Sequence, residues 1–179
     1  MTNAYHKGLI TDYINYVQTI IDLIDQYSGL SFQGKMQADE EFKKNSESIS
    51  QVIKNGYYNK FICKALSKIN KEKINQFNVY STSPNGDSCA ISIILPIHDK
   101  SIEEIIVILN LYHNEKGLFL FITGNAAVDI TGNRVRNCLN FNKKQWTFPN
   151  QNTDEIGKVI EELMDIMEDF RKQKCPVLK

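Results

Sequence analysis

This sequence of 179 residues has no formal net charge, only three arginines and no closely spaced cysteines. Lysine plus arginine number 21, as do aspartate plus glutamate, so the formal net charge is zero. A general polyanion-binding protein normally carries a basic excess, and a disordered chain normally combines high net charge with few apolar residues. Only three basic residues are arginines, which weakens phosphate recognition because the guanidinium fork is the better phosphate clamp (Arg134, Arg136, Arg171). Hydrophobic residues, at 42%, are sufficient for a buried core.

The four cysteines are widely spread and form no CxxC motif (Cys63, Cys89, Cys138, Cys175). They do not form the dense framework of a small disulfide-rich domain, so we expect free, mostly buried thiols in a reducing compartment. Residues 1–18 lack a signal-peptide pattern, because Asp12 interrupts the apolar stretch. The longest apolar-rich windows carry charges well within 18 residues, so no membrane span is predicted. We therefore expect a cytoplasmic protein without a membrane partner.

The first third of the chain has helical periodicity. Apolar residues recur at spacings of three and four between residues 9 and 27, which predicts an amphipathic helix that Gly29 ends. A second helix is predicted over 36–54, with Gly56 as its stop, and a third over 59–69.

The middle of the chain is rich in β-branched residues. Residues 76–83 and 88–97 flank the turn sequence Pro84-Asn85-Gly86-Asp87, which predicts a β-hairpin. Residues 102–112 fit either a helix or a buried strand. Because isoleucine and valine dominate this segment, we favour the strand.

The sequence Ile-Thr-Gly-Asn occurs twice, at 122–125 and at 130–133. Gly-Asn is a favoured two-residue hairpin turn, since both residues tolerate a positive φ. The repeat therefore predicts a meander of three strands, at 118–123, 126–131 and 134–141.

Residues 146–148 predict one further short strand, and residues 153–172 carry the clearest helical stripe in the chain. The predicted fold class is α+β, with N-terminal helices, an antiparallel β-meander of about six or seven strands, and a C-terminal amphipathic helix packed on the sheet. The chain contains no Pro/Gly/Ser-rich linker. This favours a single domain over 1–179, and a separate lobe over 1–70 is the alternative.

No motif for catalysis, metal binding or cofactor binding is present. The three histidines form no i, i+4 pair and have no cysteine at ligand spacing, so we interpret them as solvated loop residues (His6, His98, His113). A nucleophilic site could form only from scattered residues such as Cys89, His98 and Asp99, and a buried, inert Cys89 is the simpler interpretation.

A nucleic-acid interface is a stronger candidate. Six lysines between 54 and 73 alternate with Tyr57, Tyr58 and Phe61, and four basic residues precede Trp146. Such patterns can bind single strands by stacking and charge. The alternative, which the zero net charge favours, is a solvated helix face with its aromatic residues in the core.

The zero net charge is a sum of blocks of opposite sign. Residues 54–75 carry +5, residues 84–129 carry −4, residues 130–150 carry +4 and residues 151–170 carry −6. Acidic blocks can steer a basic protein partner, although they can equally be the solvated sides of amphipathic elements.

The overall profile resembles bacterial immunity proteins, in particular the immunity partners of contact-dependent growth-inhibition toxins. The resemblance is carried by the meander from Val79 to Phe148, with its Pro-Asn-Gly-Asp turn and two Ile-Thr-Gly-Asn sequences, and by the acidic helix Asp154–Phe170 that closes it. It implies a non-enzymatic protein that binds a cognate toxin domain, often a basic nuclease, and blocks it.

For such a protein, charge complementarity and addition of a strand at an open sheet edge are the expected modes of binding. We expect the partner to bind the acidic block of the sheet, with Tyr112 as an aromatic anchor (Asp87, Asp99, Glu103, Glu104, Tyr112, Glu115). The acidic face of the last helix is the rival surface. A single-stranded nucleic-acid-binding module with a sheet platform is the alternative function.

Overall fold

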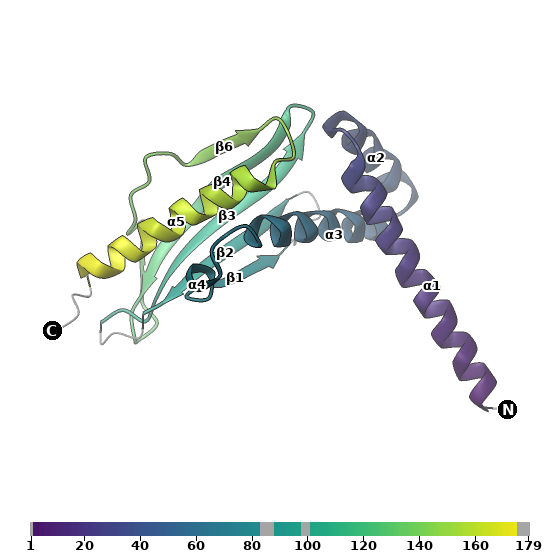
Figure 1. Ribbon diagram of the computed structural model, residues 1–179, viewed down its shortest axis with the longest axis horizontal. Helices are drawn as coiled ribbons and strands as arrows, with labels where there is room; N and C mark the ends of the chain where they lie inside the picture. The colour runs from purple at the N-terminus through teal and green to yellow at the C-terminus, as the bar shows by residue number, and fades with distance from the viewer. Residues whose placement is uncertain (1, 83–87, 98–100, 175–179) are drawn as a thin grey trace.

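An antiparallel sheet of six strands forms the centre of the protein, and helices precede and follow it in the chain (Figure 1). The structure is a computed structural model that describes residues 2–82, 88–97 and 101–174. Its elements are α1 (Thr2–Gly29), α2 (Phe32–Asn45), α3 (Glu47–Leu66), α4 (Lys71–Ile74), β1 (Asn78–Thr82), β2 (Cys89–Pro96), β3 (Glu104–Asn114), β4 (Gly117–Val128), β5 (Arg134–Arg136), β6 (Gln145–Phe148) and α5 (Thr153–Lys174). The predicted α+β class is confirmed.

The sheet has the order β1-β2-β3-β4-β5, and β6 also pairs with β4. The long strand β4 accommodates both neighbours because β6 pairs with residues 118–121 and β5 pairs with residues 126–128. The predicted hairpin is confirmed as β1 and β2, and residues 104–114 form the strand β3 rather than a helix. The predicted turn Pro84–Asp87 lies outside the described residues.

The two Ile-Thr-Gly-Asn sequences have different structures, so the three-stranded meander is wrong in detail. The first lies inside β4, where Leu109 pairs with Ile122 and Ile108 pairs with Gly124, so Thr123 is an extra residue in a β-bulge. The second forms the predicted turn, with Gly132 at a φ of +84°.

Asp129, the residue before the second copy, explains the difference. Its carboxylate accepts hydrogen bonds from the backbone N–H of Thr131 and of Asn133, at 2.8 and 2.9 Å. A side chain of this kind favours a turn over a continuing strand. Phe121, the residue before the first copy, has no polar side chain.

The helices α2 and α3 also differ from the prediction at their boundaries. The break between them falls at Ser46, whose hydroxyl accepts a hydrogen bond from the backbone N–H of Ile49 and caps α3. Gly56 does not end a helix. It lies inside α3 where α1 crosses closely, because a Cβ at this position would stand 2.2 Å from Cδ1 of Ile24.

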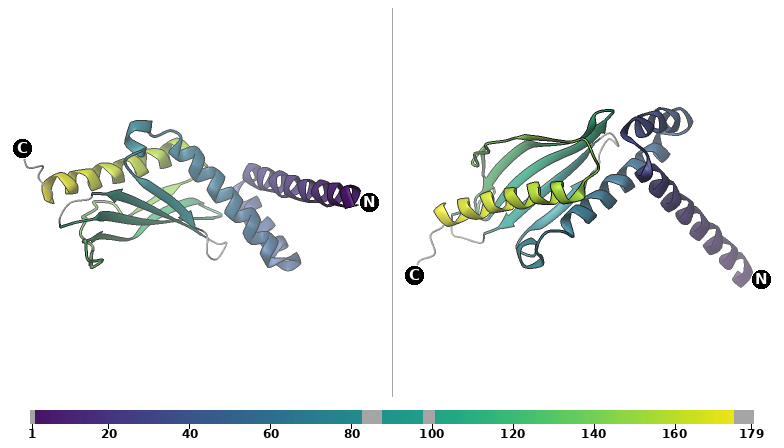
Figure 2. Two further views of the ribbon diagram at one scale, coloured as in Figure 1. Left: turned by 90° about the horizontal axis from the view of Figure 1, so that it is seen from below. Right: turned by 45° about the horizontal axis from the view of Figure 1, so that its top comes forward.

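The core lies between one face of the sheet and the helices α3 and α5 (Figure 2, left). Alternate residues of β2 and β3 point to this covered face and are fully buried (Ile91, Ile93, Leu95, Ile105, Val107, Leu109, Leu111). The predicted stripe of the last helix packs against them, which confirms the C-terminal helix on the sheet. The other residues of β2 and β3 face away from α3 and α5 and are mostly half-buried, and we call this side the open face.

Candidate binding surfaces

The six residues predicted to bind a partner do not form one patch. Asp87 and Asp99 lie outside the described residues. Glu103 and Glu104 stand at the start of β3, whereas Tyr112 is near its end and Glu115 follows in the turn to β4. Because a strand rises about 3.3 Å per residue, Glu104 and Tyr112 are separated by roughly 27 Å. The acidic block in the sequence is therefore split between two ends of the sheet.

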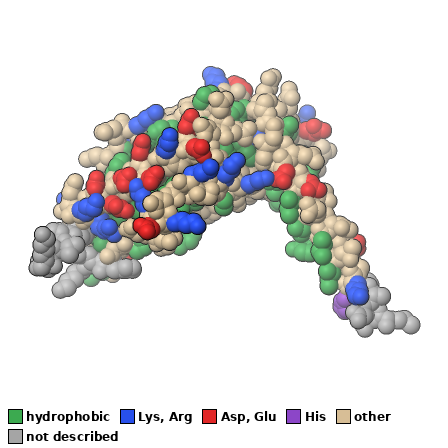
Figure 3. All heavy atoms as spheres, in the orientation of Figure 1, with side chains coloured by type: hydrophobic (Ala, Val, Ile, Leu, Met, Phe, Trp, Pro, Cys, Tyr) green, Lys and Arg blue, Asp and Glu red, His purple; other side chains and the backbone are tan. Residues whose placement is uncertain are grey.

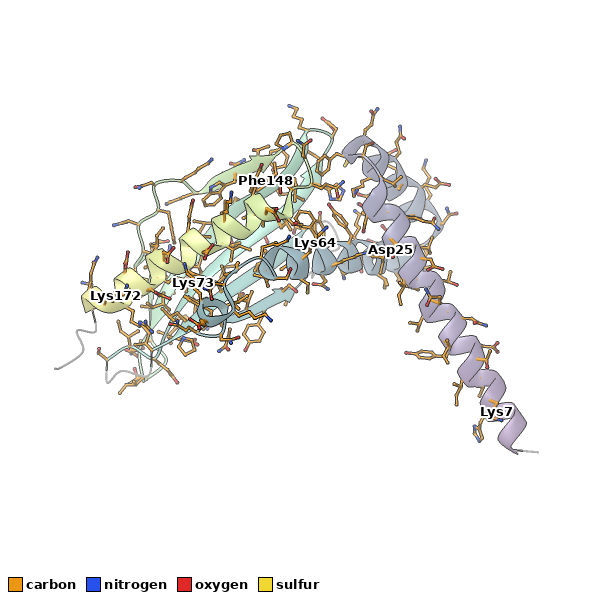
Figure 4. The ribbon with its side chains drawn as sticks, in the orientation of Figure 1. Lys7, Asp25, Lys64, Lys73, Phe148 and Lys172 are labelled. Carbon is orange, nitrogen blue, oxygen red and sulfur yellow. The ribbon has the colours of Figure 1, made fainter. Side chains whose placement is uncertain are left out.

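The rival acidic surface on α5 is partly neutralised by lysines from the preceding helices. Lys73 lies 2.5 Å from Asp165 and 3.7 Å from Glu161, and Lys68 lies 3.5 Å from Asp154. Figure 4 shows Lys73 beside α5, and Figure 3 shows acidic and basic side chains intermixed over this side of the molecule. The −6 of this segment is thus not a uniform acidic face.

The aromatic residues among the lysines of α3 belong to the core. Tyr57, Tyr58 and Phe61 are buried, as the non-functional interpretation predicted. Lys54 is also buried, and its Nζ lies 3.1 Å from Asp39 Oδ2. This half of the nucleic-acid candidate is therefore wrong, because its rings cannot stack on bases.

His113 is not a solvated loop residue but the centre of a buried polar cluster. It is 8% exposed, and Nε2 lies 3.0 Å from the hydroxyl of Tyr27 and 3.5 Å from Asp39. Its Nδ1 lies 2.8 Å from the hydroxyl of Tyr58. Tyr27 donates its own proton to Asp39 at 2.9 Å. An imidazole with its proton on Nε2 fits this set, because that proton faces both the hydroxyl of Tyr27 and the carboxylate of Asp39, and Nδ1 accepts from Tyr58.

The charges of this cluster are balanced within it. Burial alone would raise the pKa of Asp39, but hydrogen bonds from His113 and Tyr27 and the charge of Lys54 hold that pKa below its ordinary value. Burial also raises the pKa of Tyr27 and of Tyr58, so both phenols keep the protons that they donate. The cluster joins α1, α2 and α3 to the end of β3, and each member is held by the others.

Lys35 is a second buried cation in the same region. Its Nζ donates to the backbone oxygens of Ser28 and Leu30, at the C-terminal end of α1. The Nζ also lies 5.0 Å from the ring centre of Tyr57 and 5.5 Å from that of Tyr27. Burial lowers the pKa of Lys35 to about 8. Lys35 therefore fixes the end of α1 where the carbonyls lack helical partners.

Next to His113 in β3, Tyr112 points to the opposite side of the sheet, where the open face presents aromatic side chains at the end of this strand. Tyr112 stacks on Phe119 with ring centres 5.0 Å apart, and it meets Phe121 edge to face at 5.7 Å. Tyr112 also lines a hollow of about 390 Å³ between β3 and α2, together with Glu40. Glu40 and Glu115 line a second hollow beside it. We call this region the aromatic end (Glu40, Tyr112, Glu115, Phe119, Phe121).

A separate hollow of about 380 Å³ lies at the other end of the open face. The residues that line it include Ile106 and Ile108 of β3 and Arg134 and Arg136 of β5. Two of the three arginines of the chain thus line one hollow. The bulge at Thr123 lies beside it, next to Gly124.

The scattered residues proposed for an enzyme find little support in the geometry. Cys89 is fully buried, and burial raises the pKa of its thiol to about 11, so the reactive thiolate is disfavoured. His98 and Asp99 lie outside the described residues. Cys63 is exposed, contrary to the expectation of mostly buried thiols. In the described part of the chain, no three His, Cys, Asp or Glu side chains are arranged to hold a metal ion.

The sequence matches no family model, and no curated protein and no solved structure matches it either. Within residues 2–82, 88–97 and 101–174, no helix combines the length and the apolar character needed to cross a membrane.

Proposed function

We propose that this chain is a non-enzymatic inhibitor of the immunity type, which binds a cognate bacterial toxin domain in the cytoplasm and blocks it. The observation that carries this proposal is the open sheet face, whose aromatic end places three aromatic rings in mutual contact near the carboxylates of Glu40 and Glu115. Aromatic residues in a partly enclosed surface are typical anchors of protein interfaces, and a rim of carboxylates suits a basic partner.

The structure changes which of the predicted residues support the proposal. Tyr112 and Glu115 lie near each other and are joined by Glu40 of α2, which the sequence did not single out. Glu103 and Glu104 lie at the far end of β3 and would contribute at most long-range attraction, which salt screens. We therefore place the toxin at the aromatic end.

The direct test begins with the gene beside this one, for which the proposal expects a large secreted protein with a toxin domain at its C-terminus, and co-expresses that domain with the chain. We expect the chain to restore growth to cells that produce the C-terminal domain of a neighbouring large secreted protein. Tyr112→Ala should weaken binding to that domain by about 100-fold, as a central anchor does. Tyr80→Ala removes an exposed tyrosine at the edge of the sheet and serves as the matched control.

Charge reversal separates the two acidic sites. Glu40→Lys with Glu115→Lys should weaken binding more than Glu103→Lys with Glu104→Lys, at about 0.15 M salt. If neither pair nor Tyr112→Ala changes the affinity, the aromatic end is not the interface. If the neighbouring domain is not bound at all, the immunity function itself is rejected.

Single-stranded nucleic acid is the second candidate ligand, because two arginines line a hollow on the open face together with Ile106 and Ile108. Arginine binds phosphate in a bidentate manner, and flat bases can lie on apolar strands. Fluorescence anisotropy with a labelled oligothymidine at about 0.15 M salt tests this. Binding that falls with salt and is lost in Arg134→Glu with Arg136→Glu would favour nucleic acid over a toxin.

A further inference from the structure

The helix α1 leaves the body of the molecule and carries an uncovered apolar surface. It extends away from α2 and α3 over most of its length, and green hydrophobic side chains follow it in the space-filling view (Figures 1 and 3). Seven large apolar side chains on its outer part are between 36% and 68% exposed (Leu9, Ile10, Tyr13, Ile14, Tyr16, Val17, Ile21). Isolated exposed apolar residues are common, but a contiguous row of this size is typical of an interface.

This row continues one that is already packed. Ile10, Ile14, Val17, Ile21 and Ile24 follow one another at spacings of four, three, four and three residues. At the inner end of the row, Ile24 packs on α3 at Gly56. The spacing is that of two helices that pack side by side, and only the inner end finds its partner within the chain.

The charges of α1 are compatible with a second copy of the same helix. From Leu9 to Ile24 the apolar half carries no charged residue, and Asp12 and Asp22 lie on the opposite half. Two identical apolar halves can thus meet without like charges facing each other. The polar half has acidic residues rather than the lysines and arginines of helices that lie on anionic membranes, which argues against a lipid surface.

The area is also sufficient for self-association. If two copies cover the seven exposed side chains, the pair buries roughly 1,000 Å² in total, the lower limit for a specific interface. We propose that the chain self-associates through α1, with the outer apolar row of one copy packed against that of a second copy. The sheet and its open face lie away from this contact, so a partner can still bind there.

Sedimentation equilibrium between about 1 and 100 μM tests this proposal. We expect the wild-type mass to rise to twice 20.6 kDa, or to a higher multiple, within this range. Ile10→Asp with Ile14→Asp places two charges in the row and should keep the mass at that of one chain. Thr11→Asp with Asn15→Asp adds the same charges at the same spacing on the polar half and should associate like the wild type.

Circular dichroism and urea unfolding of each variant establish that it is folded. If the double isoleucine variant loses helix, Tyr13→Ser with Tyr16→Ser provides a milder change that should weaken association at least tenfold. A wild-type protein that stays monomeric at 100 μM overturns the proposal. So does association that the isoleucine variant leaves unchanged, which would place the contact elsewhere. Co-sedimentation of the monomer with phosphatidylcholine vesicles would assign the row to lipid instead.

Discussion

The strand β2 and the helix α1 both carry a regular row of isoleucine, but only β2 has its row covered within the chain. Ile91 and Ile93 are fully buried between the sheet and the helices, whereas Ile10 and Ile14 are 59% and 58% exposed. The periodicity identifies an apolar face equally well in both. What covers that face depends on topology: β2 lies inside the sheet beneath α5, whereas α1 runs away from the body (Figure 2).

The largest expected difference in stability is between two isoleucine-to-alanine substitutions, one in the row of β2 and one in the row of α1. Ile93→Ala leaves a cavity in a closely packed core and should lower the free energy of unfolding by about 3–4 kcal/mol. Ile14→Ala removes an exposed side chain and should change the free energy of unfolding of the monomer by less than about 0.5 kcal/mol, measured below the concentrations at which α1 associates. Urea denaturation measures both changes. Equal losses would mean that α1 is covered within a single chain.

The inner end of α1 differs from its outer end because it is held by the buried cluster. Asp39→Asn removes the carboxylate that pairs with the buried Lys54 and should lower the free energy of unfolding by about 3 kcal/mol. The matched control is Asp25→Asn, which removes an exposed ion pair between α1 and Lys60 of α3 and should cost less than about 1 kcal/mol. A small effect of Asp39→Asn would show that the cluster does not anchor α1.

The pH dependence of stability has a definite sign at Asp39. Its pKa is below the ordinary value in the folded state, so the unfolded chain binds the proton more tightly. The stabilisation is therefore fully present above about pH 4, the ordinary pKa of aspartate, and is lost as the pH falls through the lower, folded pKa. The difference in unfolding free energy between the wild type and Asp39→Asn should be constant from pH 5 to 7 and shrink below pH 4. A difference that grows in acid contradicts this assignment.

Much of the covered core could be predicted from the sequence, but its polar cluster could not. The alternation that identifies β3 extends one step further to His113 and points it inward, a signal that the nearby turn residues obscured. Asp39 and Lys54 are 15 residues apart on different helices, and the break at Ser46 that brings them together was not predicted.

The contacts on the open face could not be predicted from the sequence either. The residue type of Tyr112 predicts an anchor, but Phe119 and Glu40 join it only through pairing with β4 and the position of α2. The bulge at Thr123 has no local signal, since the same four residues form a turn further along the chain. Local patterns thus predict elements and faces, whereas contacts between elements depend on register.

Substitution of two glycines compares the packing at the two ends of α1. Gly56 lies inside α3 against Ile24, and an added Cβ would displace that side chain, so Gly56→Ala should destabilise by about 1 kcal/mol despite alanine's better helix propensity. Gly8 has open space around it, and Gly8→Ala should stabilise by up to about 1 kcal/mol. Thermal unfolding gives both signs. A stabilising Gly56→Ala would mean that α1 and α3 are not closely packed.

The smallest effect is a titration at the inner end of α1. Burial lowers the pKa of Lys35 to about 8, while the nearby carboxylate of Asp39 raises it in part. Heteronuclear NMR of the lysine side chains should therefore find one amine that titrates near pH 8, and Lys35→Met should remove that signal. In Asp39→Asn the same amine should titrate at a still lower pH, because the attraction of the carboxylate is gone. If every lysine titrates near the ordinary pKa of 10.5, the inner end of α1 is as open to water as its outer end. The contrast between the two ends of the helix would then disappear.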